Sequence, residues 1–195
     1  MRAERFVFPR DKDYFIAARG TLRELLGQYL GRAPEEIELQ TNKWGKPALK
    51  ESGGEPIHFN LSHSHGMAVY VFSQEGEAGI DIEKIRPELD AEEIAKRYFS
   101  ENEIRELQSL RLELRTEGFF LCWTRKEAYV KARGEGLGIP LRSFEVSLTP
   151  GEPAILRSDD TAKWNLLSLL PFPGFVAACV VPCSAKEAHL LELRR

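Results

Sequence analysis

Apolar side chains recur at helical spacing in two long segments of the chain. Over residues 11–30 they lie mostly three or four positions apart, and Gly31 follows as a stop signal. Over residues 117–133 the spacing is stronger than anywhere else in the chain, and a glycine-rich loop at residues 134–138 ends it. Each segment therefore predicts a helix that buries one face.

Two shorter segments between these also predict helices. Residues 91–98 show helical spacing, and Ser100 precedes Glu103 by three positions. In a capping box of this kind, the serine and glutamate side chains each bind the backbone amide of the other residue. We therefore expect a further helix to begin at Glu101.

The remaining apolar runs are short and predict strands. A turn-rich stretch at residues 42–56 is followed by two strands, at residues 58–61 and 67–73, on either side of a polar turn at residues 62–66. Four more strands are predicted at residues 78–83, 144–148, 164–170 and 175–181.

The mixture of helices and strands sets the fold class. They are interspersed rather than strictly alternating, so the prediction is α+β. With 195 residues, 43% of them hydrophobic, the chain can bury a core as one large domain or two small ones. We place one half at residues 1–86 and the other at residues 87–195.

Charge and cysteine content narrow the functional class. The net charge is −3, without the basic surplus typical of proteins that bind nucleic acid. Three cysteines without a spaced framework argue against a disulfide-linked secreted domain and against a zinc site. No segment approaches the ~20 apolar residues that span a bilayer, so we expect a cytoplasmic protein that does not enter membranes.

The segment Gly79-Ile80-Asp81-Ile82-Glu83 carries the most informative chemistry. On a strand, Asp81 and Glu83 share one face and repel each other unless water or a cation separates them. Carboxylate oxygens suit Mg²⁺, which binds through few carboxylates and keeps several waters. The alternative is an edge strand with a solvated polar face, and this segment alone does not exclude it.

A third carboxylate lies on the strongest predicted helix. Trp123, Glu127 and Lys131 are spaced four apart and form one stripe. Glu127 and Lys131 form a plain surface ion pair in one interpretation. If Glu127 instead faces Asp81 and Glu83, three carboxylates and a lysine converge in an arrangement suited to phosphoryl transfer.

The polar turn at residues 62–66 offers hydroxyl, imidazole and backbone N–H groups that can hold a phosphate. Nucleophilic hydrolysis by Ser62 and His63 is a weaker interpretation, because adjacent residues point apart and no G-x-S-x-G elbow is present. The loop at residues 134–138 is a weak nucleotide-binding signal, since it follows a helix rather than a strand.

Four ordered segments together resemble the 4'-phosphopantetheinyl transferases of the longer, monomeric Sfp-like branch. Each segment alone is a modest signal, but their order and spacing are specific. The four are Gly45-Lys46-Pro47, FNLSHS at residues 59–64, GIDIE at residues 79–83 and WTRKEAYVK at residues 123–131.

The resemblance implies a fold of two similar α+β halves related by a pseudo-twofold, with coenzyme A in the cleft between them. Members of this branch usually carry a strand and linker ahead of the position of Met1, so either the sequence starts late or the first half lacks its first strand. The resemblance also implies a monomer that acts on an acyl, polyketide or peptidyl carrier protein.

Residue roles follow from the same resemblance. Asp81, Glu83 and Glu127 would hold Mg²⁺, or Mn²⁺ in its place, against the pyrophosphate of coenzyme A. Glu127 would take the proton of the carrier serine, and Lys131 would neutralise the leaving group. The residues expected to bind coenzyme A are Arg2, Thr41, Asn42, Lys43, Trp44, Gly45, Lys46, Pro47, Asn60, Ser62, His63 and Lys131.

Two other functions compete with this transferase hypothesis. A non-catalytic module that binds coenzyme A or a carrier would keep the fold without the chemistry, but all four of Asp81, Glu83, Glu127 and Lys131 are present. A metal-dependent phosphoester hydrolase would use the same carboxylates, but would leave the GKP and FNLSHS segments unexplained.

Overall fold

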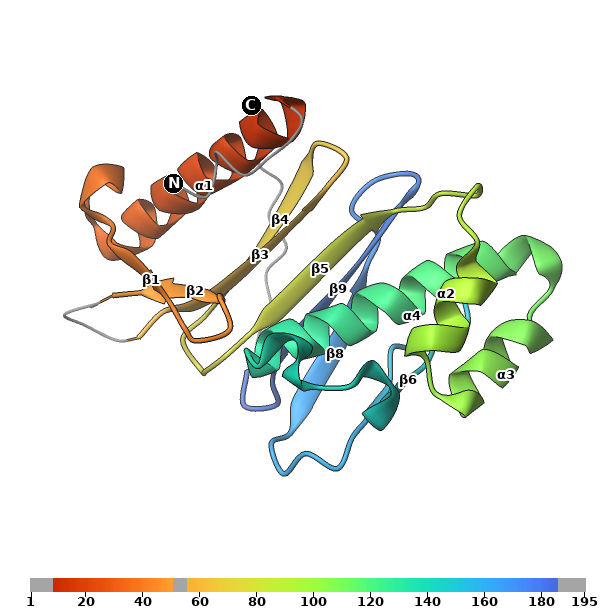
Figure 1. Cartoon of the computed structure of the whole chain (residues 1–195). Helices are drawn as coiled ribbons and strands as arrows, with labels where there is room; N and C mark the ends of the chain where they lie inside the picture. The colour runs from red at the N-terminus through yellow and green to blue at the C-terminus, as the bar shows by residue number, and fades with distance from the viewer. Residues whose placement is uncertain (1–8, 51–55, 186–195) are drawn as a thin grey trace.

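The computed structural model describes residues 9–50 and 56–185 (Figure 1). Two long helices each cross an antiparallel sheet: α1 packs on the β3–β4 hairpin, and α4 packs on the β5–β9–β8 sheet. Two short helices, α2 and α3, lie beside α4 on the side away from α1. The predicted α+β class is confirmed. The helices are α1 (Pro9–Leu30), α2 (Ala91–Tyr98), α3 (Glu101–Ser109) and α4 (Leu112–Arg133), with 3-10 turns at Pro34–Glu36, Gly136–Gly138 and Leu141–Ser143.

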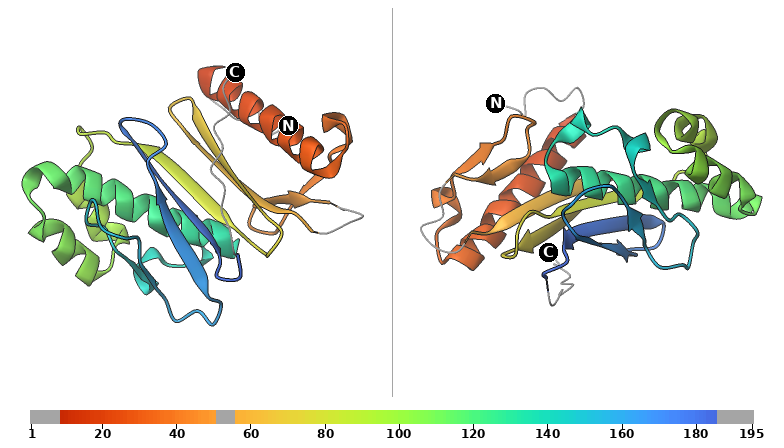
Figure 2. Two further views of the ribbon diagram at one scale, coloured as in Figure 1. Left: turned by 180° about the vertical axis from the view of Figure 1, so that it is seen from behind. Right: turned by 90° about the horizontal axis from the view of Figure 1, so that it is seen from below.

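The strands form four small antiparallel groups within the described residues. β1 pairs with β2, β3 with β4, and β6 with β7, while β9 lies between β5 and β8. Figure 2 shows α4 lying along one face of this last sheet. The strands are β1 (Leu39–Thr41), β2 (Pro47–Leu49), β3 (His58–Ser64), β4 (Met67–Ser73), β5 (Gly79–Lys84), β6 (Glu145–Val146), β7 (Leu156–Arg157), β8 (Trp164–Leu169) and β9 (Phe175–Pro182).

Three predicted boundaries were wrong. β3 continues to Ser64, so Ser62 and His63 belong to a strand, and the turn consists of His65 and Gly66. The turn-rich stretch at residues 42–56 holds β2, which pairs with β1 just before it. Helix α4 begins at Leu112, five residues before the predicted start at residue 117. None of the helices described is long and apolar enough to cross a lipid bilayer.

Close contact between β5 and α4 explains the glycine at the start of the acidic strand. A Cβ atom on Gly79 would lie 2.1 Å from the carbonyl oxygen of Ala128 and 2.3 Å from the amide nitrogen of Ala132. Any side chain here would therefore push strand and helix apart. Glycine allows α4 to approach β5 closely, which brings the polar residues of the two elements together.

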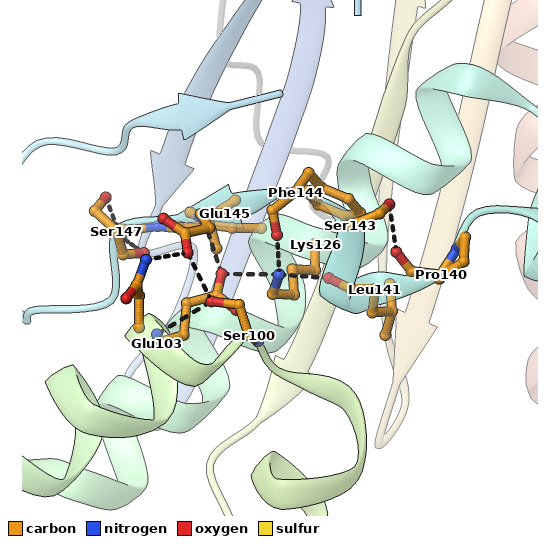
Figure 3. A network of polar contacts seen from close by, with 12 residues as sticks. Ser100, Glu103, Lys126, Pro140, Leu141, Ser143, Phe144, Glu145 and Ser147 are labelled. Carbon is orange, nitrogen blue, oxygen red and sulfur yellow. Dashed lines mark hydrogen bonds and ion pairs between the residues drawn. The ribbon is translucent and has the colours of Figure 1, made fainter. Parts of the chain in front are cut away.

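A buried ion pair joins α4 to α3, and its lysine also binds the segment that follows α4 (Figure 3). The Lys126 ammonium contacts the Glu103 carboxylate at 2.8 Å, and both side chains are at most 2% exposed. It also donates to the carbonyl oxygens of Leu141 at 2.7 Å and Phe144 at 2.6 Å. Glu103 accepts further bonds from the amides of Ser100 and Val146. Both charges are thus compensated, as buried charges require.

The boundary between the halves, predicted between residues 86 and 87, stays a prediction. β5 pairs with β9 of the later segment. The same strand also lies beside β3 of the earlier segment (Figure 1). It therefore contributes to both halves.

Candidate functional site

Side chains of β3 join it to the neighbouring strand β5. Asn60 Oδ1 accepts a hydrogen bond from the Ile80 amide at 3.0 Å, and Ser62 Oγ donates to Asp81 Oδ1 at 2.8 Å. Two residues further along, Ser64 Oγ donates to Glu83 Oε2 at 2.9 Å. Alternate residues of a strand face the same way, so polar side chains at every second position of β3 can all reach the neighbouring strand β5.

Asp81 is the most constrained carboxylate of this seam between β3 and β5. It is buried, and its Oδ1 accepts bonds from Ser62 and from Lys131 Nζ, the latter at 2.6 Å. Its Oδ2 is also buried, yet has no hydrogen-bond partner among the residues that the structure describes. Leaving a buried acceptor without a partner costs about 1–3 kcal/mol of folding free energy. A cation bound at this oxygen would offset that cost.

Two further carboxylates lie in the same electrostatic environment. Burial raises the pKa of Glu127, and the negative charges of Asp81 and Glu83 raise it further, against the effect of Lys131. Burial also raises the pKa of Glu83, with an added contribution from Asp81. These mutual effects, together with the 2.6 Å contact between Lys131 of α4 and Asp81 of β5, favour the second interpretation of the Glu127 and Lys131 stripe.

A cavity of about 340 Å³ opens beside these groups, a size typical of small-molecule sites. Glu127 and Lys131 lie on its wall, and Trp44, half exposed, also lines it. Both halves therefore contribute to one cavity. Its lining residues are Trp44, Gly45, Lys46, Pro47, Asn60, Leu61, Glu127, Val130, Lys131, Gly134, Gly136, Ile139 and Leu141.

The turn at residues 42–47 is tied to the end of α4. Asn42 Oδ1 accepts bonds from the amides of Trp44 and Lys46, and its Nδ2 donates to the Gly134 carbonyl at 2.7 Å. Lys46 Nζ donates to the carbonyl oxygens of Ala78 and Ala132 and to the Glu77 carboxylate. The last carbonyls of a helix lack partners within it, so these bonds cap α4 and fix one wall of the cavity.

The carboxylates of the seam are oxygen donors of the kind that Mg²⁺ prefers. Within the described part of the chain, no three His, Cys, Asp or Glu side chains converge closely enough to hold an ion by themselves. Mg²⁺ does not need a closed cage of protein ligands, because it keeps several waters and binds substrate phosphates. The partnerless Asp81 Oδ2 is a ready oxygen ligand beside two other carboxylates, so the donor set fits Mg²⁺.

Most of the predicted site residues meet at this cavity or at the seam beside it. Seven of the described ones do not line the cavity itself. Asp81, Glu83 and Ser62 lie in the seam, and Asn42 binds the Gly134 carbonyl of the cavity wall. Thr41 and Lys43 are exposed on the turn side, and His63 is exposed on β3. Lys43 lies over the Trp44 ring instead, 5.4 Å from its centroid. Arg2 lies outside the described residues.

Sequence reasoning missed Asp160, which anchors the end of α4 from the later segment. Its Oδ2 accepts bonds from Arg133 at 2.8 Å, from Trp164 Nε1 at 2.9 Å and from the Tyr129 hydroxyl at 3.1 Å. Arg133 directly precedes Gly134 of the cavity wall. The segment between β7 and β8 carries no recognisable motif, so no sequence signal pointed to this residue.

Two family models match the chain in succession. Residues 1–75 match the model described as 4'-phosphopantetheinyl transferase, N-terminal. Residues 77–180 match the model described as 4'-phosphopantetheinyl transferase superfamily. The two matches together include both strands of the seam and the whole of α4.

Similar proteins occur among curated sequences and solved structures. The 4'-phosphopantetheinyl transferase HetI of Nostoc sp. is 42% identical over 181 residues, which cover 92% of this chain and 75% of that protein. The 4'-phosphopantetheinyl transferase Sfp of Bacillus subtilis is 30% identical over 180 residues, covering 91% and 78%. A holo-(acyl-carrier-protein) synthase from Bacillus anthracis, solved in complex with CoA (3',5'-ADP), is 28% identical, with a TM-score of 0.48 over 54% of this chain and 94% of that one.

Proposed function

The chain belongs to the 4'-phosphopantetheinyl transferase superfamily, and we propose that it transfers 4'-phosphopantetheine from coenzyme A to a serine of an apo carrier protein. The second product is 3',5'-ADP. The reaction depends on Mg²⁺, for which Mn²⁺ can substitute because oxygen ligands suit both ions. The carrier is an acyl, polyketide or peptidyl carrier protein.

One observation carries this proposal. Asp81 presents a buried, partnerless oxygen beside Glu83, Glu127 and the Lys131 ammonium, next to a cavity between the halves. A metal-clamped pyrophosphate needs this combination of oxygen ligands and a cation. Mg²⁺ held by Asp81, Glu83 and Glu127 would neutralise charge on the phosphates when bound.

Each residue has a separate task in the proposed reaction. The carrier serine oxygen forms a bond to the phosphorus that bears pantetheine, and the bond from that phosphorus to the bridging oxygen breaks. Glu127, or a water that it orients, takes the serine proton, for which its raised pKa is favourable. Lys131 lies against Asp81 at 2.6 Å and stabilises the charge that develops on the departing 3',5'-ADP.

Coenzyme A would occupy the part of the cavity that is lined by the turn at residues 42–47. Gly45, Lys46 and Pro47 line the wall there. The Lys46 ammonium caps α4, so we assign this lysine to shaping the pocket as well as to the electrostatic field that meets the phosphates. Ser62 and Asn60 line the seam from the other side.

Cellular context completes the proposal. The three cysteines are free thiols, and Cys183 is exposed, which suits the reducing cytoplasm. We place the enzyme there as a monomer.

Replacing Asp81 with asparagine tests the proposed function. Asparagine keeps an oxygen that accepts from Ser62 and Lys131, but removes the negative charge that a metal needs. Transfer to a carrier is expected to fall by about 10²–10³-fold, as when one electrostatic group is removed from an active site. Initial rates of carrier modification, measured by mass spectrometry, check this. Asp159→Asn, at an exposed position, is the matched control. A wild-type rate for Asp81→Asn would overturn the assignment.

The transfer rate is expected to fall on acidification, with a midpoint above the ordinary pKa of a glutamate. Burial raises the pKa of both Glu127 and Glu83, so they take up protons at a higher pH than exposed glutamates do. Metal ligands must be deprotonated, so metal competes with protons. Raising the Mg²⁺ concentration should therefore shift the acidic limb of the rate profile to lower pH. An acidic limb that stays fixed across Mg²⁺ concentrations would contradict this coupling.

A further inference from the structure

Ser64 occupies a special position at the end of β3. It pairs with Met67 across a hairpin whose two-residue turn is His65 and Gly66, with φ values of 49° and 82°. Two residues with positive φ suit the tight turns that match strand twist, and histidine tolerates this conformation better than most residues. The turn directs the His65 ring back toward Ser64, with Nδ1 3.0 Å from Ser64 Oγ.

The hydrogen bonds of the Ser64 hydroxyl have one consistent arrangement. Its Oγ lies 2.9 Å from Glu83 Oε2 and accepts a bond from the Lys84 amide at 3.3 Å. A hydroxyl has one proton and two acceptor positions, and an ionised carboxylate only accepts. The single proton therefore points to Glu83, while the Lys84 amide and His65 Nδ1–H donate to the oxygen. The hydroxyl is saturated and its direction is set from three sides.

The same pattern occurs two residues earlier on the strand. Ser62 donates to Asp81 as Ser64 donates to Glu83, and both serines are less than 10% exposed. Two hydroxyls at alternate positions of β3 thus match two carboxylates at alternate positions of β5. This pairing holds side by side two groups that would otherwise repel each other.

We propose that Ser64 is a positioning residue that fixes the Glu83 carboxylate as a metal ligand, with its own hydroxyl oriented by His65 and the Lys84 amide. The inference rests on the proposed function, because it takes Glu83 as a ligand for Mg²⁺ or Mn²⁺. Partners that orient metal ligands typically change metal affinity by about 10–100-fold when they are removed. Ser64 would act through Glu83, to which its hydroxyl donates.

Mn²⁺ titration in the presence of coenzyme A, followed by the electron paramagnetic resonance signal of free Mn²⁺, tests this role. Ser64→Ala is expected to weaken Mn²⁺ binding about 10-fold or more. Ser64→Thr keeps the hydroxyl and should restore most of the affinity. Ser73→Ala is the control, since that serine lies on β4 and accepts a bond from the Glu75 amide. Coenzyme A binding in EDTA should be the same in all four proteins.

The Asp81→Asn variant in the same titration distinguishes failure of the Ser64 positioning role from failure of the metal site. If Asp81→Asn loses Mn²⁺ while Ser64→Ala binds it like the wild type, the positioning role is wrong and the metal site stands. If both variants bind Mn²⁺ like the wild type, the metal site itself is wrong. Should Ser64→Ala lower the folded fraction, Ser64→Cys gives the same test, because a thiol is only a weak donor.

Discussion

Replacing Glu127 with glutamine is expected to lower the rate of transfer by about 10²–10⁴-fold, the range for loss of a general base. The same change is expected to raise the melting temperature of the metal-free protein. Burial and the charges of Asp81 and Glu83 raise the pKa of Glu127, so its ionised form is disfavoured in the folded state. Glutamine keeps the shape without the charge.

The sign of the stability effect follows from proton linkage. A carboxyl with a raised pKa in the folded state contributes stability below its ordinary pKa, and this contribution is lost as the pH rises through the folded pKa. At neutral pH the ionised Glu127 therefore costs folding free energy, which glutamine removes. For a chain of this size, each gain of 1 kcal/mol in the free energy of unfolding raises the melting temperature by about 2–4 °C.

Two measurements check the Glu127 prediction together. Calorimetry in EDTA gives the melting temperature, and carrier modification by mass spectrometry gives the rate. Glu113→Gln is a matched control on the same helix, since the ion pair of Glu113 with Arg111 is exposed and contributes little to stability. A Glu127→Gln protein that is both inactive and less stable than the wild type would indicate a structural role, and an active one would remove Glu127 from the mechanism.

Replacing Lys126 with methionine is expected to lower the free energy of unfolding by about 3–5 kcal/mol, the usual cost of breaking a buried ion pair. Methionine fills much of the volume, but Glu103 is then left as a buried charge without its cation. The carbonyl oxygens of Leu141 and Phe144 also lose a donor. Urea denaturation followed by circular dichroism measures the change.

A double variant shows how much of the loss in stability comes from the unpaired charge of Glu103. In Lys126→Met with Glu103→Gln, the neutral amide still accepts from the Val146 amide, and no uncompensated charge remains. The double variant is expected to be more stable than Lys126→Met alone. If Lys126→Met unfolds at the same urea concentration as the wild type, neither the ion pair with Glu103 nor the bonds to Leu141 and Phe144 stabilise the fold.

Local sequence signals predicted several elements closely because their causes are local. The predicted helix at residues 91–98 matches α2, and the capping box is present, with Ser100 and Glu103 each binding the amide of the other. The acidic strand was also predicted, since alternating apolar and acidic residues suit a half-buried strand. These features depend on neighbours within a few positions.

The errors arise where distant segments meet. Ser62 and Ser64 suggested a turn because strands seldom carry polar residues on a buried face, yet both are buried against the carboxylates of β5. The ammonium of Lys46 is bound to the carbonyl groups of Ala78, just before β5, and of Ala132 in α4, which no local pattern indicates. The partnerless oxygen of Asp81 is likewise a tertiary feature. A single sequence carries no record of such contacts.

Intact mass spectrometry of an apo carrier protein is the most direct test of the proposed transferase. Acyl, polyketide and peptidyl carriers are each incubated with the full chain, coenzyme A and Mg²⁺, and in parallel with EDTA in place of Mg²⁺. We expect at least one carrier to gain the mass of a single phosphopantetheine group with Mg²⁺ and to gain nothing with EDTA. Equal gain in EDTA, or no gain on any of the three carriers, would contradict a metal-dependent transfer at the site around Asp81, Glu83 and Glu127.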